Sequence, residues 1–227
     1  MVNETYDGEV APGGPAQTRS LGCVTMTKVA VDPEMSNNAY LLRCDETGDQ
    51  VLIDAAAEPE TLRELVGDGG LTTIVTTHQH WDHHRALKEL AEATGAEIVA
   101  GAPDADAITE QTGVAVDRRL AHGDTVAVGS CTLRVIALAG HTPGSIALLL
   151  DDEHTEHPHL WTGDSLFPGG VGNTFGDDAA FQQLIDDVDT KVFGELPDST
   201  YFYPGHGNDS TLGEERPHVE QWRARGW

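Results

Sequence analysis

Four histidines and one aspartate stand together in Thr77-His78-Gln79-His80-Trp81-Asp82-His83-His84. The run before this stretch, Thr72 to Thr76, is apolar and β-branched, which predicts a buried strand. The residues after it, 86–91, carry apolar side chains at helical spacing, and Gly95 is typical of a helix end. The sequence therefore predicts that the histidines lie in a loop between a strand and a helix.

The spacing within this loop indicates a metal site. Residues two apart in an extended backbone point the same way, so His78 and His80 can bind one metal ion. Where the chain turns into the helix, Asp82 and His83 point to a second position beside the first. Imidazole and carboxylate are suitable ligands for Zn²⁺ and Fe²⁺, so we interpret the group as ligands rather than core histidines.

Three further candidate ligands each follow a predicted strand, in turns rich in glycine. They lie in Gly140-His141-Thr142-Pro143-Gly144-Ser145, Thr162-Gly163-Asp164-Ser165 and Pro204-Gly205-His206-Gly207. Small neighbours allow the backbone to come close to a metal centre. The complete candidate set is His78, His80, Asp82, His83, His141, Asp164 and His206. Seven ligands suffice for two divalent metal ions bridged by a carboxylate and a hydroxide.

The rest of the chain predicts an α+β fold. Strands are predicted at Cys23–Val31, Asn38–Cys44, Gln50–Asp54, Thr125–Val128, Thr132–Leu138, Ser145–Leu150, Leu160–Thr162 and Tyr201–Tyr203, and helices at Pro59–Val66, Asp178–Val192 and Glu214–Arg225. Two strand-rich halves closed by helices predict two sheets packed face to face with helices outside. We expect residues 1–20 to form a flexible arm and residues 21–227 a single domain.

The ordered motifs resemble a known family. Thr-His-x-His-x-Asp-His, Gly-His-Thr-Pro-Gly-Ser, Thr-Gly-Asp-Ser and Pro-Gly-His-Gly are similar to those of the metallo-β-lactamase-fold superfamily, in particular its glyoxalase-II-like hydrolases. The resemblance covers residues 22–213, and the stretches Thr77–His84 and Gly163–Thr174 are most similar to actinobacterial members. It implies a four-layer αββα sandwich of the metallo-β-lactamase type, with the site at its open edge.

The resemblance also implies a role for each ligand. The implied sets are His78, His80 and His141 for one metal, Asp82, His83 and His206 for the second, and Asp164 as the bridge. Glyoxalase II has a C-terminal domain that binds glutathione, but only 21 of the 227 residues follow His206, so we expect no such domain. The commonest zinc β-lactamases have a cysteine where this sequence has Asp164, so we do not expect a β-lactamase.

A binuclear metallo-hydrolase is the function that these residues favour. Two adjacent metals lower the pKa of a bridging water from about 15.7 to about 7, and the hydroxide can attack an acyl carbonyl. Asp82 and Asp164 are the predicted catalytic carboxylates. A thiolate with a pKa of about 8.5 departs without a general acid, which favours a small thioester, or a related acyl or lactone substrate. We expect Zn²⁺, with iron or manganese as alternative metals.

Two other functions remain open. An iron-dependent, persulfide-dioxygenase-like oxidoreductase could use His78, His141 and Asp164 as a face of two histidines and one carboxylate. However, Gly172-Asn173-Thr174 replaces the Arg-Thr-Asp-like triplet of that branch. A non-catalytic metal-binding module is the second alternative, and the completeness of the ligand set argues against it.

Composition excludes other classes of partner. The formal net charge is −25, and no Lys/Arg cluster exists beyond Arg118-Arg119, so we expect neither nucleic acid nor an anionic membrane surface as a partner. The longest strongly apolar run, Ile146 to Leu150, is too short to span a bilayer. The expected partner is a small-molecule substrate, and the oligomeric state is open.

The N-terminal residues and the cysteines predict the compartment. The first twenty residues contain acidic side chains and no apolar core, so we expect no secretory signal and a cytoplasmic location. Cys23, Cys44 and Cys131 are predicted to be three isolated, buried thiols. Three further histidines, His154, His157 and His159, are predicted to lie in a solvated loop.

Overall fold

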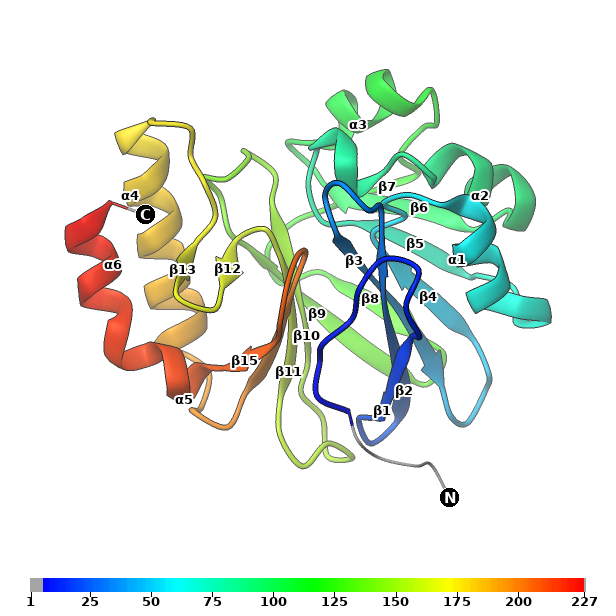
Figure 1. Ribbon diagram of the computed structural model, residues 1–227, viewed down its shortest axis with the longest axis horizontal. Helices are drawn as coiled ribbons and strands as arrows, with labels where there is room; N and C mark the ends of the chain where they lie inside the picture. Colours follow the sequence, from blue (N-terminus) through cyan, green and yellow to red (C-terminus); the bar gives the residue numbers. More distant parts are fainter. Residues whose placement is uncertain (1–5, 227) are drawn as a thin grey trace.

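Two β-sheets pack face to face between two layers of helices (Figure 1). The computed structural model describes residues 6–226. The arrangement confirms the predicted α+β class and the four-layer αββα sandwich.

The first sheet has seven strands in sequence order, antiparallel from β1 to β4 and parallel from β4 to β7. The strands are β1 (Gln17–Ser20), β2 (Val24–Val31), β3 (Asn37–Cys44), β4 (Gln50–Ile53), β5 (Thr73–Thr76), β6 (Glu97–Gly101) and β7 (Arg118–Leu120). The helices on its outer face are α1 (Pro59–Val66), α2 (Leu87–Thr94) and α3 (Ala105–Thr112). Two 3₁₀ turns, Gly67–Gly69 and Trp81–His83, complete this half.

The second sheet has six strands in the order β15-β14-β11-β10-β9-β8. These are β8 (Thr125–Val128), β9 (Cys131–Ala137), β10 (Ile146–Leu150), β11 (His159–Gly163), β14 (Tyr201–Pro204) and β15 (Ser210–Thr211), and a hairpin of β12 (Leu166–Phe167) and β13 (Gly170–Val171) lies beside them. The helical segments of this half are α4 (Asp178–Asp187), a π-helical turn (Val188–Phe193), α5 (Leu212–Glu215), a 3₁₀ turn (Arg216–His218) and α6 (Val219–Arg225). Side chains of α4 and α6 pack on the outer face of the sheet.

Alternating apolar side chains build three cores, one between each pair of layers. In β3, Tyr40 and Leu42 face the second sheet, whereas Ala39 and Leu41 face the helices. The strand β10 alternates in the same way between the central core and the core beneath α4. Because both faces of each sheet are covered, apolar side chains point to both sides of these strands rather than to one side only.

The structure differs from the sequence-based prediction in two segments. Gln17–Ser20 do not belong to a loose arm. They form an edge strand that pairs with β2, with Thr18 opposite Thr27 and Arg19 opposite Met26. Residues 1–5 of the predicted arm lie outside the described residues. The sequence pattern predicts no strand or helix in segment 97–120, yet the structure has β6, α3 and β7 there. The single domain over residues 21–227 remains a prediction.

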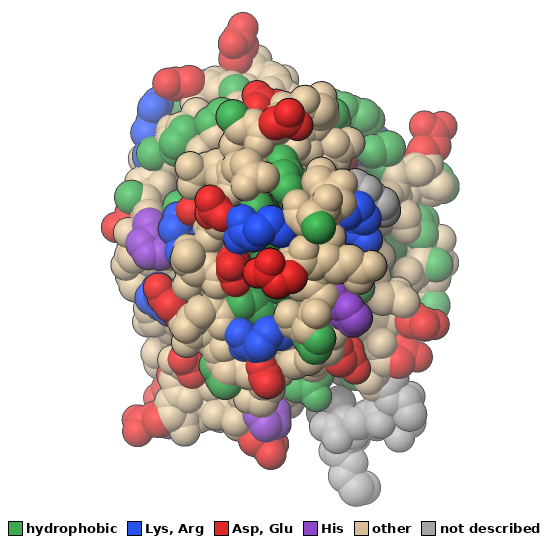
Figure 2. Space-filling view, turned by 90° about the vertical axis from the view of Figure 1, so that its left-hand side faces the viewer, with side chains coloured by type: hydrophobic (Ala, Val, Ile, Leu, Met, Phe, Trp, Pro, Cys, Tyr) green, Lys and Arg blue, Asp and Glu red, His purple; other side chains and the backbone are tan. Residues whose placement is uncertain are grey.

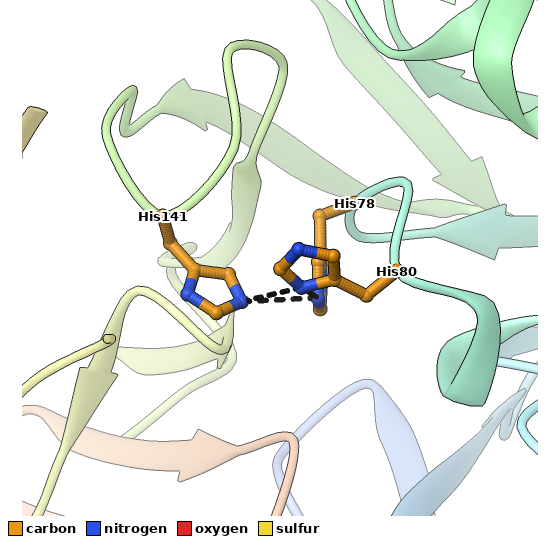
Figure 3. Close-up of side chains that lie close together, drawn as sticks. All are labelled: His78, His80 and His141. Atoms are coloured by element: carbon orange, nitrogen blue, oxygen red, sulfur yellow. Dashed lines mark hydrogen bonds between the residues drawn. The ribbon is translucent and has the colours of Figure 1, made fainter. Parts of the chain in front are cut away.

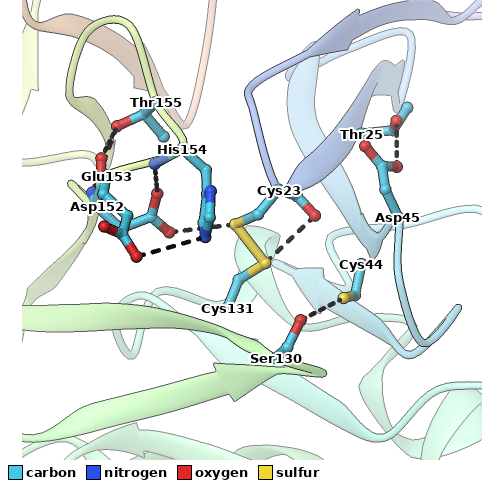
Figure 4. The surroundings of a disulfide bond; sticks show 10 residues. All are labelled: Cys23, Thr25, Cys44, Asp45, Ser130, Cys131, Asp152, Glu153, His154 and Thr155. Atoms are coloured by element: carbon cyan, nitrogen blue, oxygen red, sulfur yellow. Dashed lines mark hydrogen bonds and ion pairs between the residues drawn. A yellow bond between two sulfur atoms is a disulfide. The ribbon is translucent and has the colours of Figure 1, made fainter.

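A disulfide joins the two sheets (Figure 4). Cys23 directly precedes β2, and Cys131 begins β9, 108 residues further along the chain. The prediction of three isolated thiols is therefore wrong for this pair, since closure of the sandwich brings together two residues that no local pattern connects. Cys44 is a free, buried thiol as predicted.

The surface over α4 and α6 mixes acidic and basic side chains (Figure 2). Arg223, for example, forms ion pairs with Asp186 and Asp189. Among residues 6–226 there is no helix with the length and apolar character that crossing a membrane requires.

Candidate metal centre

All seven predicted ligands meet at one edge of the sandwich. They occupy loops that follow four strand ends, with His78, His80, Asp82 and His83 after β5, His141 after β9, Asp164 after β11 and His206 after β14. Backbone hydrogen bonds hold these loops together: Ile146 donates to the carbonyl of Thr77, and Asn38 donates to that of Gly205. The site therefore forms only when both sheets are in place.

The first triad consists of His78, His80 and His141, whose rings converge on one point (Figure 3). His78 Nε2 lies 3.1 Å from His80 Nδ1, which lies 2.9 Å from His141 Nε2, and the third side of the triangle measures 3.3 Å. A tetrahedral metal with metal–nitrogen bonds of about 2.0–2.1 Å requires nitrogens about 3.3 Å apart. The triad has nearly that size.

The second triad consists of Asp82, His83 and His206. His83 Nε2 lies 3.2 Å from His206 Nε2, and each of these nitrogens lies 3.4 Å from Asp82 Oδ2. Two imidazoles and one carboxylate again enclose a space of the size that a divalent cation needs.

Asp164 lies between the two triads. Its Oδ1 is 3.4 Å from His83 Nε2, and its Oδ2 is 3.7 Å from His141 Nε2 and 3.6 Å from His206 Nε2. The buried Oδ1 has no hydrogen-bond partner within residues 6–226. A buried carboxylate oxygen without a donor fits a metal ligand, because an unsatisfied buried acceptor is otherwise costly.

Burial keeps the first triad uncharged. Removal from water lowers the pKa of His78 well below its ordinary value and also lowers the pKa values of His80 and His141. Neighbouring imidazoles lower the pKa of His78 further. Neutral imidazoles offer the lone pairs that a metal ion requires.

The second triad holds opposite charges close together. Burial alone would lower the pKa of His83, but the carboxylates of Asp164 and Asp54 outweigh it and raise that pKa well above its ordinary value. Burial alone would raise the pKa of Asp82. The hydrogen bond from His206 and the charge of His83 outweigh burial and hold this pKa below its ordinary value. The carboxylates of Asp54, Asp82 and Asp164 thus favour positive charge at this position, as a bound metal cation would supply it.

Three polar residues that the sequence analysis missed orient the ligands. Asp54 accepts hydrogen bonds from the backbone and hydroxyl of Thr77, both at 2.8 Å, and its Oδ2 lies 2.8 Å from His83 Nδ1. Asn37 donates its amide to Asp82 Oδ2 at 2.9 Å. Asp54 ends a strand-like run, but nothing in that pattern distinguishes it from an ordinary turn residue.

The third of these residues, Asp104, connects two ligand loops. Its carboxylate accepts hydrogen bonds from the backbone of Gln79 at 2.9 Å, the hydroxyl of Thr142 at 2.5 Å and the backbone of Gly144 at 2.7 Å. It is fully buried. Its position before α3 carries no sequence signal for this role.

Gly205 allows a close approach between its backbone and two proposed ligands. A Cβ atom at this position would lie 2.2 Å from Asp164 Oδ1 and 2.7 Å from His83 Cε1. The glycine beside His206 is therefore a steric requirement, as the motif suggested.

The other side chains near the motif have different roles. His84 is buried, and its Nε2 lies 3.1 Å from the carbonyl of Gln79, so it braces the loop. Tyr203 belongs to the central core, whereas Trp81 is exposed at the site. His159 is buried against Tyr203, so the prediction of a solvated loop is wrong for this histidine.

The chain is similar to several known proteins. The family model described as the metallo-beta-lactamase superfamily matches residues 32–206. A hydroxyacylglutathione hydrolase of Rhodospirillum rubrum is 36% identical over 171 residues, which cover 75% of this chain and 62% of that protein. This chain spans between 59% and 62% of the length of such curated relatives.

Two solved structures are also similar. A metallo-beta-lactamase from Staphylococcus aureus superposes with a TM-score of 0.74 at 26% identity, covering 86% of this chain and 62% of that chain. A protein solved in a di-iron-bound form is 32% identical with a TM-score of 0.63, covering 83% of this chain and 96% of that one.

Proposed function

We propose a hydrolytic function for this chain, which belongs to the metallo-β-lactamase superfamily. The chain hydrolyses small thioesters, or related acyl and lactone substrates, with two divalent metal ions. The proposed ligands are His78, His80 and His141 for one metal, Asp82, His83 and His206 for the other, and Asp164 for both.

The position of Asp164 is the observation that carries this proposal. Its two oxygens face histidines of both triads at 3.4–3.7 Å. A single metal would need only one triad, whereas a carboxylate between two triads suits a pair of ions and a water between them.

The residues of the chain orient the reaction. When bound, divalent metals would make a coordinated water acidic near neutral pH and would polarise the substrate carbonyl. Asp164 and Asp82 direct their carboxylates into this space, where they orient the attacking water and hold its proton. Asn37 and Asp54 fix Asp82 and His83 in turn.

A thioester suits the site better than an amide does. A thiolate has a pKa of about 8.5 and departs without protonation, whereas an amine leaving group needs a general acid. The titratable groups at the centre are the proposed ligands themselves and their buried partners. The names of the relatives, hydroxyacylglutathione hydrolases, support the same reaction class.

Metal analysis combined with a substrate panel tests the proposal. Protein purified without added metal is expected to contain about two divalent ions per chain, with zinc as the expected metal. It should hydrolyse thioesters and lose this activity on chelation, and zinc should restore it. A content of one ion per chain, or no turnover of any thioester or lactone by replete protein, would contradict the proposal.

Iron is the alternative metal, because a relative was solved in a di-iron-bound form. An oxidoreductase acting on a persulfide would then compete with hydrolysis. Iron content together with persulfide-dependent oxygen uptake would favour this second function, and iron-loaded protein that hydrolyses thioesters without oxygen uptake would exclude it.

A cytoplasmic location is the remaining part of the proposal. It is supported by Cys44, a buried cysteine that remains a free thiol, as is usual in a reducing compartment. The Cys23–Cys131 disulfide points the other way, since such bonds persist mainly in oxidising compartments. Cell fractionation decides between them, and recovery outside the cytoplasm would reject the proposed location.

A further inference from the structure

We infer that Met35, Trp81 and Phe175 form an apolar collar around the metal centre that binds the acyl chain of an apolar thioester. This inference rests on the proposed hydrolysis and adds the class of substrate. The three side chains come from three separate loops, after β2, β5 and β13.

The exposure of these side chains is unusual for this protein. Met35 is 41% exposed, Trp81 54% and Phe175 70%, and within residues 6–226 they are the large hydrophobic side chains that stand out from the surface. Isolated exposed hydrophobic residues are common, but residues that gather at one site mark a binding surface. Here each of these residues adjoins a proposed metal ligand: Phe175 by its ring, Met35 by its backbone carbonyl and Trp81 by its place in the chain.

Phe175 lies against the first triad. Its ring centroid is 5.6 Å from that of His80, edge to face, and 6.1 Å from that of His141. Its backbone adopts a left-handed φ of +56°, which is rare for a bulky residue, and Asn173 Oδ1 accepts the Phe175 N–H at 2.8 Å. The loop is thus held in a strained conformation that places an aromatic ring over the histidines.

Met35 and Trp81 lie on the side of the second triad. The carbonyl of Met35 accepts a hydrogen bond from His206 Nδ1 at 3.0 Å, and Trp81 directly precedes Asp82. The Arg85 guanidinium stacks 4.8 Å from the Trp81 ring centroid and pairs with Asp32, in the loop that carries Met35. The collar therefore borders both triads.

Charge at the entrance favours a neutral chain. The positive charge of Arg85 is compensated by the carboxylate of Asp32. Glu34 and Asp177, exposed neighbours of Met35 and Phe175, add negative charge. An anionic substrate arm would be repelled here, whereas an uncharged acyl chain gains free energy by leaving water for the collar.

Matched thioesters of one neutral thiol test the collar. For octanoyl and acetyl thioesters of N-acetylcysteamine, we expect kcat/KM to be at least about tenfold higher for octanoyl, since each methylene fully buried is worth roughly fourfold. Phe175→Ala should lower this ratio several-fold. Tyr201→Ala, which truncates an aromatic side chain at the opposite end of β14, should leave the ratio unchanged.

A ratio near one in the wild type, or a ratio unaffected by Phe175→Ala, Met35→Ala and Trp81→Ala alike, would overturn the inference. If no thioester is hydrolysed, the proposed function fails, and binding then decides the collar separately. Octanoate should shift the emission of Trp81 to shorter wavelength and bind more tightly than acetate, and Phe175→Ala should weaken octanoate binding several-fold. Trp81→Phe identifies the fluorescence signal. Equal affinities for octanoate and acetate would reject the collar.

Discussion

Thr142 donates its hydroxyl to the buried carboxylate of Asp104 at 2.5 Å, and the same carboxylate accepts the backbone N–H of Gln79, so that Asp104 connects the His141 loop to the loop that carries His78 and His80. Asp104 does not belong to either triad. It accepts hydrogen bonds from backbone or side-chain groups of both loops, so it fixes the distance between them. The first triad therefore depends on a residue that has no ligand character of its own.

Replacing this carboxylate tests its positioning role. Asp104→Asn leaves one acceptor oxygen for three donors and buries an amide group beside a donor, which should cost about 1–3 kcal/mol of the free energy of unfolding. Affinity for the first metal should fall about tenfold. Asp106→Asn, in the first turn of α3, which begins directly after Asp104, breaks an exposed ion pair with Arg119 and is the matched control. Equal metal affinity in both variants would refute the role of Asp104.

The bridging assignment makes a stronger prediction. Asp164→Ala should lower hydrolysis by at least about 100-fold while circular dichroism and cooperative thermal unfolding show an intact fold. Asp68→Ala, on an exposed turn, should change neither. Full activity of Asp164→Ala with two bound metals would show that this carboxylate does not bridge.

The buried imidazole of His159 should make the protein less stable as the pH falls. Burial, then the charges of Arg19 and His157, lower the pKa of His159 to about 3. The unfolded chain takes up this proton near pH 6.5 and the native chain does not, so stability is lost as pH falls from about 6.5 towards 3, by up to about 1.4 kcal/mol per unit. His159→Asn removes this loss and keeps an acceptor for Tyr203. The free energies of unfolding of the wild type and of His159→Asn, measured with denaturant from pH 7 to 4, should converge as the pH falls. If the two free energies changed in parallel with pH, the low pKa of His159 would be contradicted.

The disulfide should make a large contribution to stability. Because Cys23 and Cys131 close a loop with a sequence separation of 108, the bond should stabilise the native state by about 4–5 kcal/mol through the unfolded chain. A reductant should therefore lower the unfolding midpoint of the wild type. The midpoint of the double variant Cys23→Ser/Cys131→Ser should not change. An identical response of the two proteins would mean that the bond does not form in solution.

The sequence predicts those parts of the fold whose pattern is contained in a few neighbouring residues. Strands such as β3 and β10 carry apolar runs bounded by turn residues, and the ligands carry their chemistry in short motifs at strand ends. By contrast, α3 has only Ala105 and Ile108 buried, so its helical periodicity is weak. The short strand β7 begins with two arginines and lies at a sheet edge, so its sequence lacks an apolar run.

The residues that orient the ligands escape prediction for a different reason. Asp54, Asn37 and Asp104 are small polar residues at element ends, where turns and caps use the same types. Their function depends on partners between 23 and 45 positions away, such as Thr77 for Asp54 and Asp82 for Asn37. Only the folded chain brings such partners together, and the same is true of Cys23 and Cys131.

The two sheets are fastened at opposite ends. Cys23 and Cys131 lie where β2 and β9 begin, whereas the ligand loops gather where β5, β9, β11 and β14 finish. Loss of the ions would remove the link at the ligand edge and leave the Cys23–Cys131 disulfide in place. The two sheets should then separate first at the ligand edge and pivot about the disulfide. Hydrogen exchange of the apo-protein would then be fastest in the ligand loops and slowest beside Val24 and Thr132.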